Sequence, residues 1–282
     1  MNSYQSYLFD LFKEYRPEPT YPTYPPYHQG LYLEDTFIKD FQKNNVSYDR
    51  YFIPISWTTV YCDAKEHGLQ EKLNQLDNSK KYFTVSQHDD AIKEILPQDT
   101  ISFCAGGNAG GIPIPLICSK ISNVPLSNTK DLLCSFVGSI THQIRVLMYQ
   151  ALENKHDCFM YAKHWNPEVK NEEKDLFLEM ASRSKFLLCP RGYGLNSFRL
   201  YEAFQLGCVP VIITDKPFLP WADELVWSKF SVLILPNDIN NMYNILNNIN
   251  QNDYKTMLDT GQKLYNDYFT LGSLYSNIVR RI

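Results

Sequence analysis

Residues 187–203 read Leu-Leu-Cys-Pro-Arg-Gly-Tyr-Gly-Leu-Asn-Ser-Phe-Arg-Leu-Tyr-Glu-Ala. The apolar run that ends at Cys189 predicts a buried strand, and Gly192 and Gly194 permit a tight loop after it. Ser197 stands where an N-cap residue would begin the next helix. A strand that passes through a glycine-rich loop into a helix is the repeating unit of parallel α/β sheets.

Apolar patterning extends this alternation along the whole chain. The sequence predicts strands at 51–55, 82–85, 101–103, 132–137, 158–161, 186–189, 209–214 and 231–235. It predicts helices at 34–43, 65–76, 91–96, 141–153, 172–184, 197–206, 238–249 and 254–281. Residues 121–130, rich in Asn, Ser and Pro, form the best candidate linker. We therefore expect two α/β domains, 1–125 and 126–282, facing each other across a cleft, with the last helix able to pack back on the first domain.

Composition excludes several classes of protein. Of the 282 residues 44% are hydrophobic, and the net charge is only −4, which gives no broad attraction for nucleic acid or an anionic membrane. The seven cysteines form no CxxC pair and read as reduced thiols. No apolar run approaches the ~20 residues of a membrane span, and the N-terminus lacks the features of a signal peptide. Taken as complete, the chain is expected to be soluble and cytoplasmic.

Other segments carry weaker signals. The proline-rich stretch 17–26 predicts an extended surface arm, with a polyproline peptide ligand as the less favoured interpretation. The glycine-rich loop 105–111 lacks the Lys-Ser/Thr ending of a P-loop, so ATP hydrolysis is disfavoured; it is either a loop that closes on a ligand or an ordinary surface loop. The spacing of His156, Asp157 and His164 does not favour a zinc site.

The loop and helix at 191–202 are suited to binding a phosphate. Ligands of open α/β sheets bind at the carboxyl ends of strands, where the amide groups and dipole of a helix N-terminus favour an anion. Arg191 and Arg199 add cations for a pyrophosphate, and Glu202 lies one turn into the helix, where it can accept the hydroxyls of a ribose. The alternative is that Arg199 and Glu202 form a plain i,i+3 pair on a solvated helix face.

These residues resemble the core motif of the exostosin family of glycosyltransferases. The likeness is carried by Pro190-Arg191-Gly192, Ser197-Phe198-Arg199, Glu202-Ala203, Gly207-Cys208-Val209-Pro210-Val211, Leu219-Pro220-Trp221 and Val226-Trp227-Ser228. A weaker likeness lies upstream, in Glu34-Asp35-Thr36-Phe37, Tyr51-Phe52-Ile53-Pro54, Ser86-Gln87-His88-Asp89, Ile112-Pro113-Ile114-Pro115 and Phe136-Val137-Gly138 with Arg145. Asn196 departs from the family pattern, which has glycine there in many members.

The resemblance implies a GT-B fold of two Rossmann-like domains, an acceptor-binding domain followed by a nucleotide-sugar-binding domain. It implies a UDP-sugar donor, inversion at the anomeric carbon, a glycan acceptor and no obligatory metal or other cofactor. The donor-site residues would be Arg145, Arg191, Gly192, Tyr193, Gly194, Ser197, Phe198, Arg199 and Glu202. Members of the family usually carry a signal anchor, which this sequence lacks, so a soluble viral or microbial enzyme and a UDP-xylose donor are favoured.

Inversion also needs a base for the acceptor hydroxyl. Asp89 and His88 follow a predicted strand of the first domain, which is the right place by topology, and Glu34 and Asp63 are reserve candidates. The alternative is an ordinary polar turn in which Asp89 or Asp90 caps the next helix. Two other functions stay open, namely a non-catalytic glycan- or nucleotide-binding module of the same fold and an enzyme that modifies the sugar nucleotide itself.

Overall fold

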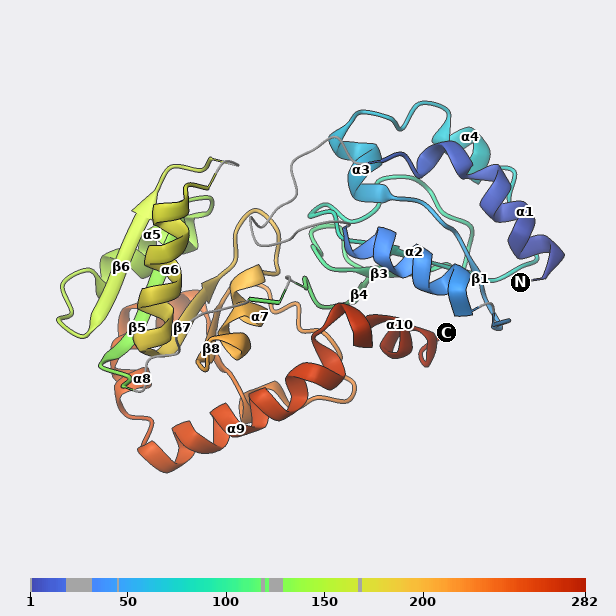
Figure 1. Cartoon of the computed structure of the whole chain (residues 1–282). Helices are drawn as coiled ribbons and strands as arrows, with labels where there is room; N and C mark the ends of the chain where they lie inside the picture. The colour runs from blue at the N-terminus through green and yellow to red at the C-terminus, as the bar shows by residue number, and fades with distance from the viewer. Residues whose placement is uncertain (1, 19–31, 45, 118–119, 122–128, 167–168) are drawn as a thin grey trace.

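The computed structural model describes residues 2–18, 32–44, 46–117, 120–121, 129–166 and 169–282. Figure 1 shows two lobes, each built around its own β-sheet. The first sheet has four strands and the second has five, and neighbouring strands are parallel throughout both. The predicted α/β fold of the GT-B type, with two Rossmann-like parts, is confirmed. Residues 19–26 of the predicted arm and 122–128 of the predicted linker lie outside the described residues.

The first sheet follows chain order. Its strands are β1 (Tyr51–Phe52), β2 (Tyr82–Ser86), β3 (Ile101–Cys104) and β4 (Ile112–Pro113). Every residue of β2 is buried, as expected for a strand that is covered on both faces. The helices of this lobe are α1 (Ser3–Leu11), α2 (Leu33–Asn44), α3 (Trp57–Cys62) and α4 (Leu69–Leu73), with a 3-10 turn η1 (Lys13–Tyr15).

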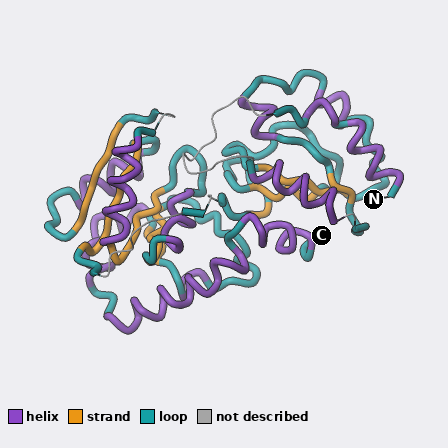
Figure 2. The backbone as a smooth tube through the Cα atoms, viewed as in Figure 1, coloured by secondary structure: helices purple, strands orange, loops and turns teal. Residues whose placement is uncertain are grey.

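The second sheet has the strand order β6-β5-β7-β8-β9. Its strands are β5 (Leu132–Ser139), β6 (Cys158–Lys163), β7 (Ser184–Pro190), β8 (Val209–Ile213) and β9 (Val232–Ile234). Its helices are α5 (Gln143–Leu152), α6 (Asn171–Arg183), α7 (Phe198–Gln205), α8 (Met242–Asn247) and α9 (Gln251–Tyr268), with 3-10 turns η2 (Trp227–Lys229) and η3 (Pro236–Asn241). Figure 2 shows strands and helices alternating through this lobe.

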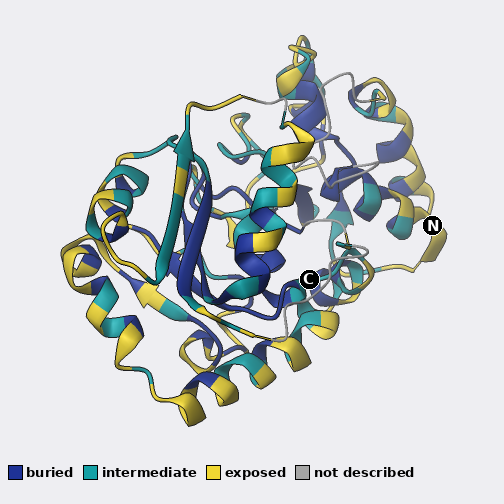
Figure 3. Cartoon of the chain, turned by 60° about the vertical axis from the view of Figure 1, so that its left-hand side comes forward, coloured by how far each residue is buried: buried dark blue, intermediate teal, exposed yellow. Residues whose placement is uncertain are grey.

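Successive side chains of β7 point to opposite faces of the second sheet, and an apolar cluster covers each face. Phe186 and Leu188 point into the apolar cluster that contains α5 and α8, whereas Leu187 and Cys189 point into the cluster that contains α6 and α7. The second cluster continues into the first lobe, where it includes Phe83 and other residues of α2 and β2. A core shared by the two lobes therefore holds them together, and Figure 3 shows the buried strands enclosed between partly exposed helices.

The C-terminal segment returns from the second lobe to the first, as Figure 1 shows in red. A single helix was predicted over 254–281, but the chain breaks after α9 and restarts as α10 (Leu271–Val279), capped by Thr270. The Tyr275 hydroxyl lies 2.6 Å from the Tyr48 hydroxyl, and the Tyr275 ring packs on Phe37 of α2. The break turns α10 so that it lies against the first lobe.

Three other predictions of secondary structure were wrong. No helix forms at 91–96, because Ala91 has a φ of 57° and Asp99 a φ of 59°, so the connection from β2 to β3 is an irregular loop. Asp89 and Asp90 consequently cap no helix there. The helix predicted at 65–76 shortens to α4, since Gly68 adopts a φ of 76°. The segment after β1, for which the sequence predicted no helix, forms α3.

Candidate active site

The loop between β7 and α7 is held by backbone hydrogen bonds on both sides. The Arg191 amide donates to the Ile213 carbonyl at 2.9 Å, and the Leu195 amide donates across to the Gly106 carbonyl of the first lobe at 3.0 Å. Ser197 is the N-cap of α7 with an extended backbone, as predicted, but its hydroxyl makes no capping hydrogen bond. The positive end of the α7 dipole therefore points toward the loop with the Ser197 hydroxyl beside it.

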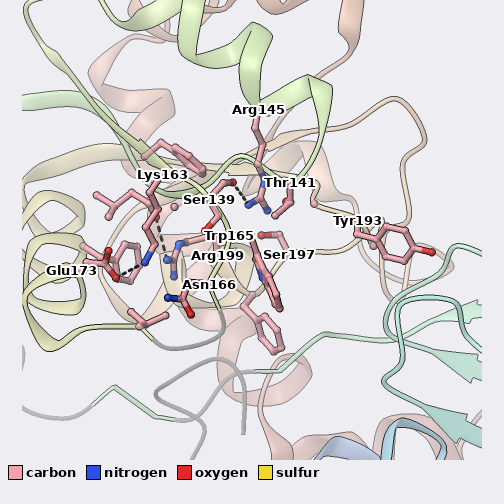
Figure 4. Close-up of a pocket in the computed structure, with 18 of the residues that line it drawn as sticks. Ser139, Thr141, Arg145, Lys163, Trp165, Asn166, Glu173, Tyr193, Ser197 and Arg199 are labelled. Carbon is pink, nitrogen blue, oxygen red and sulfur yellow. Dashed lines mark hydrogen bonds and ion pairs between the residues drawn. The ribbon is translucent and has the colours of Figure 1, made fainter. Parts of the chain in front are cut away.

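A cavity of about 220 Å³ lies at the carboxyl ends of β5, β6 and β7. Figure 4 shows residues of the second lobe that line it, and Asp89 of the first lobe belongs to the lining as well. Its polar lining comprises Asp89, Ser139, Thr141, Arg145, Lys163, Asn166, Glu173, Lys174, Tyr193, Asn196, Ser197 and Arg199. Its apolar lining includes Leu116, Phe136, Val137, Tyr161, Trp165, Val169, Phe177 and Phe198.

The strand order explains why the cavity forms at this place. From β5 the chain moves to β6 on one side and then returns to β7 on the other, so the connections diverge above the edge between β5 and β7. Diverging connections leave a crevice at the carboxyl ends of the strands, which is where open α/β sheets bind ligands. The strand order was not available from the sequence, which predicted only that these strands alternate with helices.

Arg145, on α5, reaches into the cavity as predicted. Its guanidinium donates hydrogen bonds to the carbonyls of Ser139 at 2.8 Å, Arg191 at 3.0 Å and Pro190 at 3.2 Å. A Cβ added at Gly192 would lie 3.0 Å from this guanidinium, so a glycine here lets the loop pack closely against the cation. The positive charge is thus fixed between the ends of β5 and β7.

Arg191 does not line this cavity, although it was predicted to bind the donor. Its guanidinium donates to Asp215 at 2.7 Å and to the Tyr193 carbonyl at 2.9 Å. The hydrogen bond from Arg191 holds the pKa of Asp215 below its usual range. In this structure Arg191 shapes the glycine loop from outside.

Arg199 and Glu202 form an ion pair within α7, but the pair does not lie on a solvated helix face. The Glu202 side chain is fully buried, its Oε1 has no hydrogen-bond partner in the described part of the chain, and it does not line the cavity. The Arg199 guanidinium lies 3.7 Å from the centre of the Phe177 ring and does line the cavity. The Glu202 carboxylate is directed at Arg199 and not into the cavity. Its predicted role in binding the ribose hydroxyls therefore stays a prediction.

Asp89 enters the cavity from the first lobe and lies next to Gly194 of the glycine loop. Burial and, to a smaller extent, the neighbouring Asp90 raise the pKa of its carboxyl to about 6, against the lowering effects of Arg145 and Arg191. Hydrogen bonds from Asn108 and Tyr193 keep Asp90 ionised by lowering its pKa against the effect of burial. A carboxyl with a pKa near 6 is well suited to take up a proton at neutral pH.

The other candidate bases lie away from the cavity lining. His88 packs edge-on against the Tyr61 ring at 4.9 Å between centroids, and burial lowers the pKa of its imidazole. Glu34 is buried under the end of β2, where it accepts hydrogen bonds from the Thr58 and Gln87 amides, and burial raises its pKa to about 8. Asp63 pairs with the neighbouring Lys65 at 3.0 Å.

The exostosin GT47 domain model matches residues 105–249, which is half of the chain. The chain belongs to the exostosin GT47 family. The matched region spans the whole second sheet and every lining residue of the cavity except Asp89, which lies upstream of it.

Individual relatives of this GT47 chain match over shorter stretches. A probable glycosyltransferase of Arabidopsis thaliana is 32% identical over 133 residues, which are 47% of this chain and 24% of that protein. An exostosin-1 homolog of Caenorhabditis elegans is 30% identical over 117 residues, which are 42% of this chain and 30% of that protein. The matches thus span a quarter to a third of these relatives. Among solved structures, a glycosyltransferase from Rickettsia africae superposes with a TM-score of 0.47 and 10% identity over 94% of this chain and 83% of that one.

Sequence reasoning missed the lining residues that this GT47 chain supplies from β6 and α6. Lys163 ends β6, Trp165 follows it, and Glu173 lies in the first turn of α6. The usable signal for Lys163 and Trp165 was position, because they closely follow a predicted strand at 158–161. In the described ranges no three His, Cys, Asp or Glu side chains gather as metal ligands would, and no helix combines the length and apolar character needed to cross a bilayer.

Proposed function

We propose that the chain transfers a sugar from a UDP-sugar to a hydroxyl group of a glycan acceptor, with inversion at the anomeric carbon. The observation that carries this proposal is the position of the Asp89 carboxylate, which lines one cavity together with Arg145 and the glycine loop before α7. A base and anion-binding groups around one cavity are what a single displacement requires.

The diphosphate of the donor lies between Arg145, the Ser197 hydroxyl and the N-terminus of α7. These groups offset the negative charge that the diphosphate gains as it leaves, and the reaction needs no metal in this scheme. Arg199 lines the same cavity and adds a further positive charge, while Glu202 holds its guanidinium in place. Arg191 acts indirectly by fixing Tyr193 and the loop.

Asp89 acts as the base. The acceptor oxygen forms a bond to C1 of the sugar, the bond from C1 to the phosphate oxygen breaks, and the hydroxyl proton passes to Asp89. Arg145 and Arg191 favour the ionised carboxylate that this step needs, since both lower the pKa of Asp89. UDP leaves as the second product, so atoms and charge balance without another reactant.

Membership of the family does not specify which sugar the donor carries. UDP-xylose is the donor favoured by the sequence, and UDP-glucuronic acid is the second candidate, because relatives in Oryza sativa are named probable glucuronosyltransferases. Release of UDP from each of a panel of UDP-sugars, with and without oligosaccharide acceptors, ranks the donors. A preference for UDP-galactose would contradict both choices.

The Asp89→Asn variant tests the chemistry. We expect turnover to fall at least ~100-fold, while UDP affinity measured by calorimetry stays within about threefold of the wild type. His88→Ala is the matched control, because His88 is adjacent in sequence but outside the cavity lining, and its effect should be much smaller. UDP binding without any release of UDP from the donor panel would instead support a non-catalytic binding module.

A further inference from the structure

The cavity has two ends that differ in chemistry. In Figure 4 Thr141 and Arg145 lie toward one side, with Tyr193 beyond them, and Lys163, Asn166 and Glu173 lie at the other. The first side holds the glycine loop and Asp89, and it is the place proposed above for the diphosphate and the reacting carbon. The nucleoside of the donor must therefore extend from the diphosphate in another direction.

Cavity size decides between the two directions along the sheet. Toward β8 the space beside the glycine loop is only about 10 Å³, lined by Arg191, Leu195 and Phe218 among others, which is room for about one water molecule. Toward β6 the cavity of about 220 Å³ continues to Lys163, Trp165 and Glu173. Among the described residues, the enclosed space large enough for part of a nucleoside therefore lies toward β6.

Trp165 stands out among the four tryptophans of the chain. Trp57, Trp221 and Trp227 are at most 5% exposed, whereas Trp165 is 54% exposed and lines the cavity. An indole ring that is left open on a cavity wall offers a flat surface on which a planar base stacks, and such stacking contributes about 1–3 kcal/mol per base.

The segment that carries Trp165 is anchored by an ion pair. The Lys163 ammonium group bonds to the Glu173 carboxylate, and both side chains are partly buried. The same carboxylate accepts a hydrogen bond from the Lys170 amide at 3.2 Å. The end of β6, two residues before Trp165, is thereby tied to the start of α6.

We propose that Trp165 forms the stacking wall of a nucleoside subsite, on which the uracil ring of the UDP-sugar lies. The proposal rests on the proposed function and extends it, because it assigns recognition of the base to Trp165, which lies just after β6. The glycine loop and Arg145 then bind the diphosphate. The base and the diphosphate of the nucleotide are thus bound by different elements of the second lobe.

Fluorescence tests this subsite directly, because only Trp165 emits from an exposed position. UDP, UMP and inorganic pyrophosphate are each titrated into the whole protein, with the red edge of the tryptophan emission as the signal and calorimetry for affinity. We expect UDP and UMP to quench the emission and pyrophosphate to leave it unchanged. In Trp165→Phe the quenching disappears while UDP affinity stays within about threefold.

The Trp165→Ala variant should bind UDP and UMP at least ~10-fold more weakly, which corresponds to about 1.4 kcal/mol, and pyrophosphate equally well. Tyr7→Ala, which removes an exposed ring of the first lobe, is the control and should change none of these affinities. Two results would contradict the nucleoside subsite while leaving the proposed donor site intact. One is that Trp165→Ala binds UDP as tightly as the wild-type protein does. The other is that pyrophosphate quenches the emission as strongly as UDP. If wild-type protein binds no UDP, both proposals fail.

Discussion

The Asp89 carboxylate lies directly against Gly194, so closely that a Cβ on Gly194 would come within 2.2 Å of the Asp89 Oδ1 atom. The contact joins the two lobes, because Asp89 follows β2 and Gly194 belongs to the loop before α7. Next to it the Leu195 amide donates to the Gly106 carbonyl. The absence of one side chain thus allows the proposed base to reach the donor loop.

Replacing Gly194 with alanine should displace Asp89 from its position. We expect Gly194→Ala to lower turnover about 100-fold, because a shift of about 1 Å in a catalytic group has an effect of this size. Steady-state UDP release measures it. Gly272→Ala is the matched control, since an added Cβ there meets nothing closer than 3.9 Å. Normal turnover of Gly194→Ala would show that the close approach of Asp89 is unimportant.

Activity should depend on pH through Asp89. The base must be ionised, so kcat/KM should fall as the pH drops through about 6, the value to which burial and Asp90 raise the pKa of Asp89. Asp90→Asn removes a negative charge that raises this pKa, and its acidic limb should therefore shift to lower pH. Asp99→Asn, in the loop outside the cavity, should leave the profile unchanged. A shift to higher pH in Asp90→Asn would contradict the assignment.

The ion pair between Arg199 and the buried Glu202 should contribute to stability. Glu202→Gln leaves the Arg199 charge poorly compensated and should lower the free energy of unfolding by about 3 kcal/mol in chemical denaturation. Asp131→Asn breaks the exposed pair with Arg183 and should cost less than about 1 kcal/mol. Equal losses in the two variants would mean that burial of the first pair has no energetic consequence.

Removal of the Tyr275 hydroxyl should weaken the attachment of α10 to the first lobe. The lost hydrogen bond to Tyr48 predicts a decrease of about 1 kcal/mol in the unfolding free energy of Tyr275→Phe, measured by urea denaturation. Tyr7→Phe removes a hydroxyl from an exposed ring and serves as the control. An unchanged midpoint for Tyr275→Phe would indicate that apolar packing against Phe37 alone holds α10.

The amino-acid sequence by itself determined the α/β class, most of the strands and the loop from β7 into α7. These features follow from local patterns, because an apolar run, two glycines and an N-cap serine specify strand, loop and helix without knowledge of the rest of the chain. The family resemblance carried by 190–202 also came from the sequence. The loop at 91–96 was missed because the left-handed backbone of Ala91 leaves no trace in an apolar helical pattern.

Tertiary structure alone decided which side chains share the cavity. The order β6-β5-β7 brings Lys163 and Trp165 beside Arg145 and the glycine loop, and no sequence pattern encodes strand order. In the folded chain Glu202 is buried and Arg191 points toward Asp215, so neither lines the cavity. Both residues nevertheless fit the exostosin motif in the sequence. It also brought Asp89 against Gly194, over 100 residues away in the sequence, because two separate sheets share one apolar core.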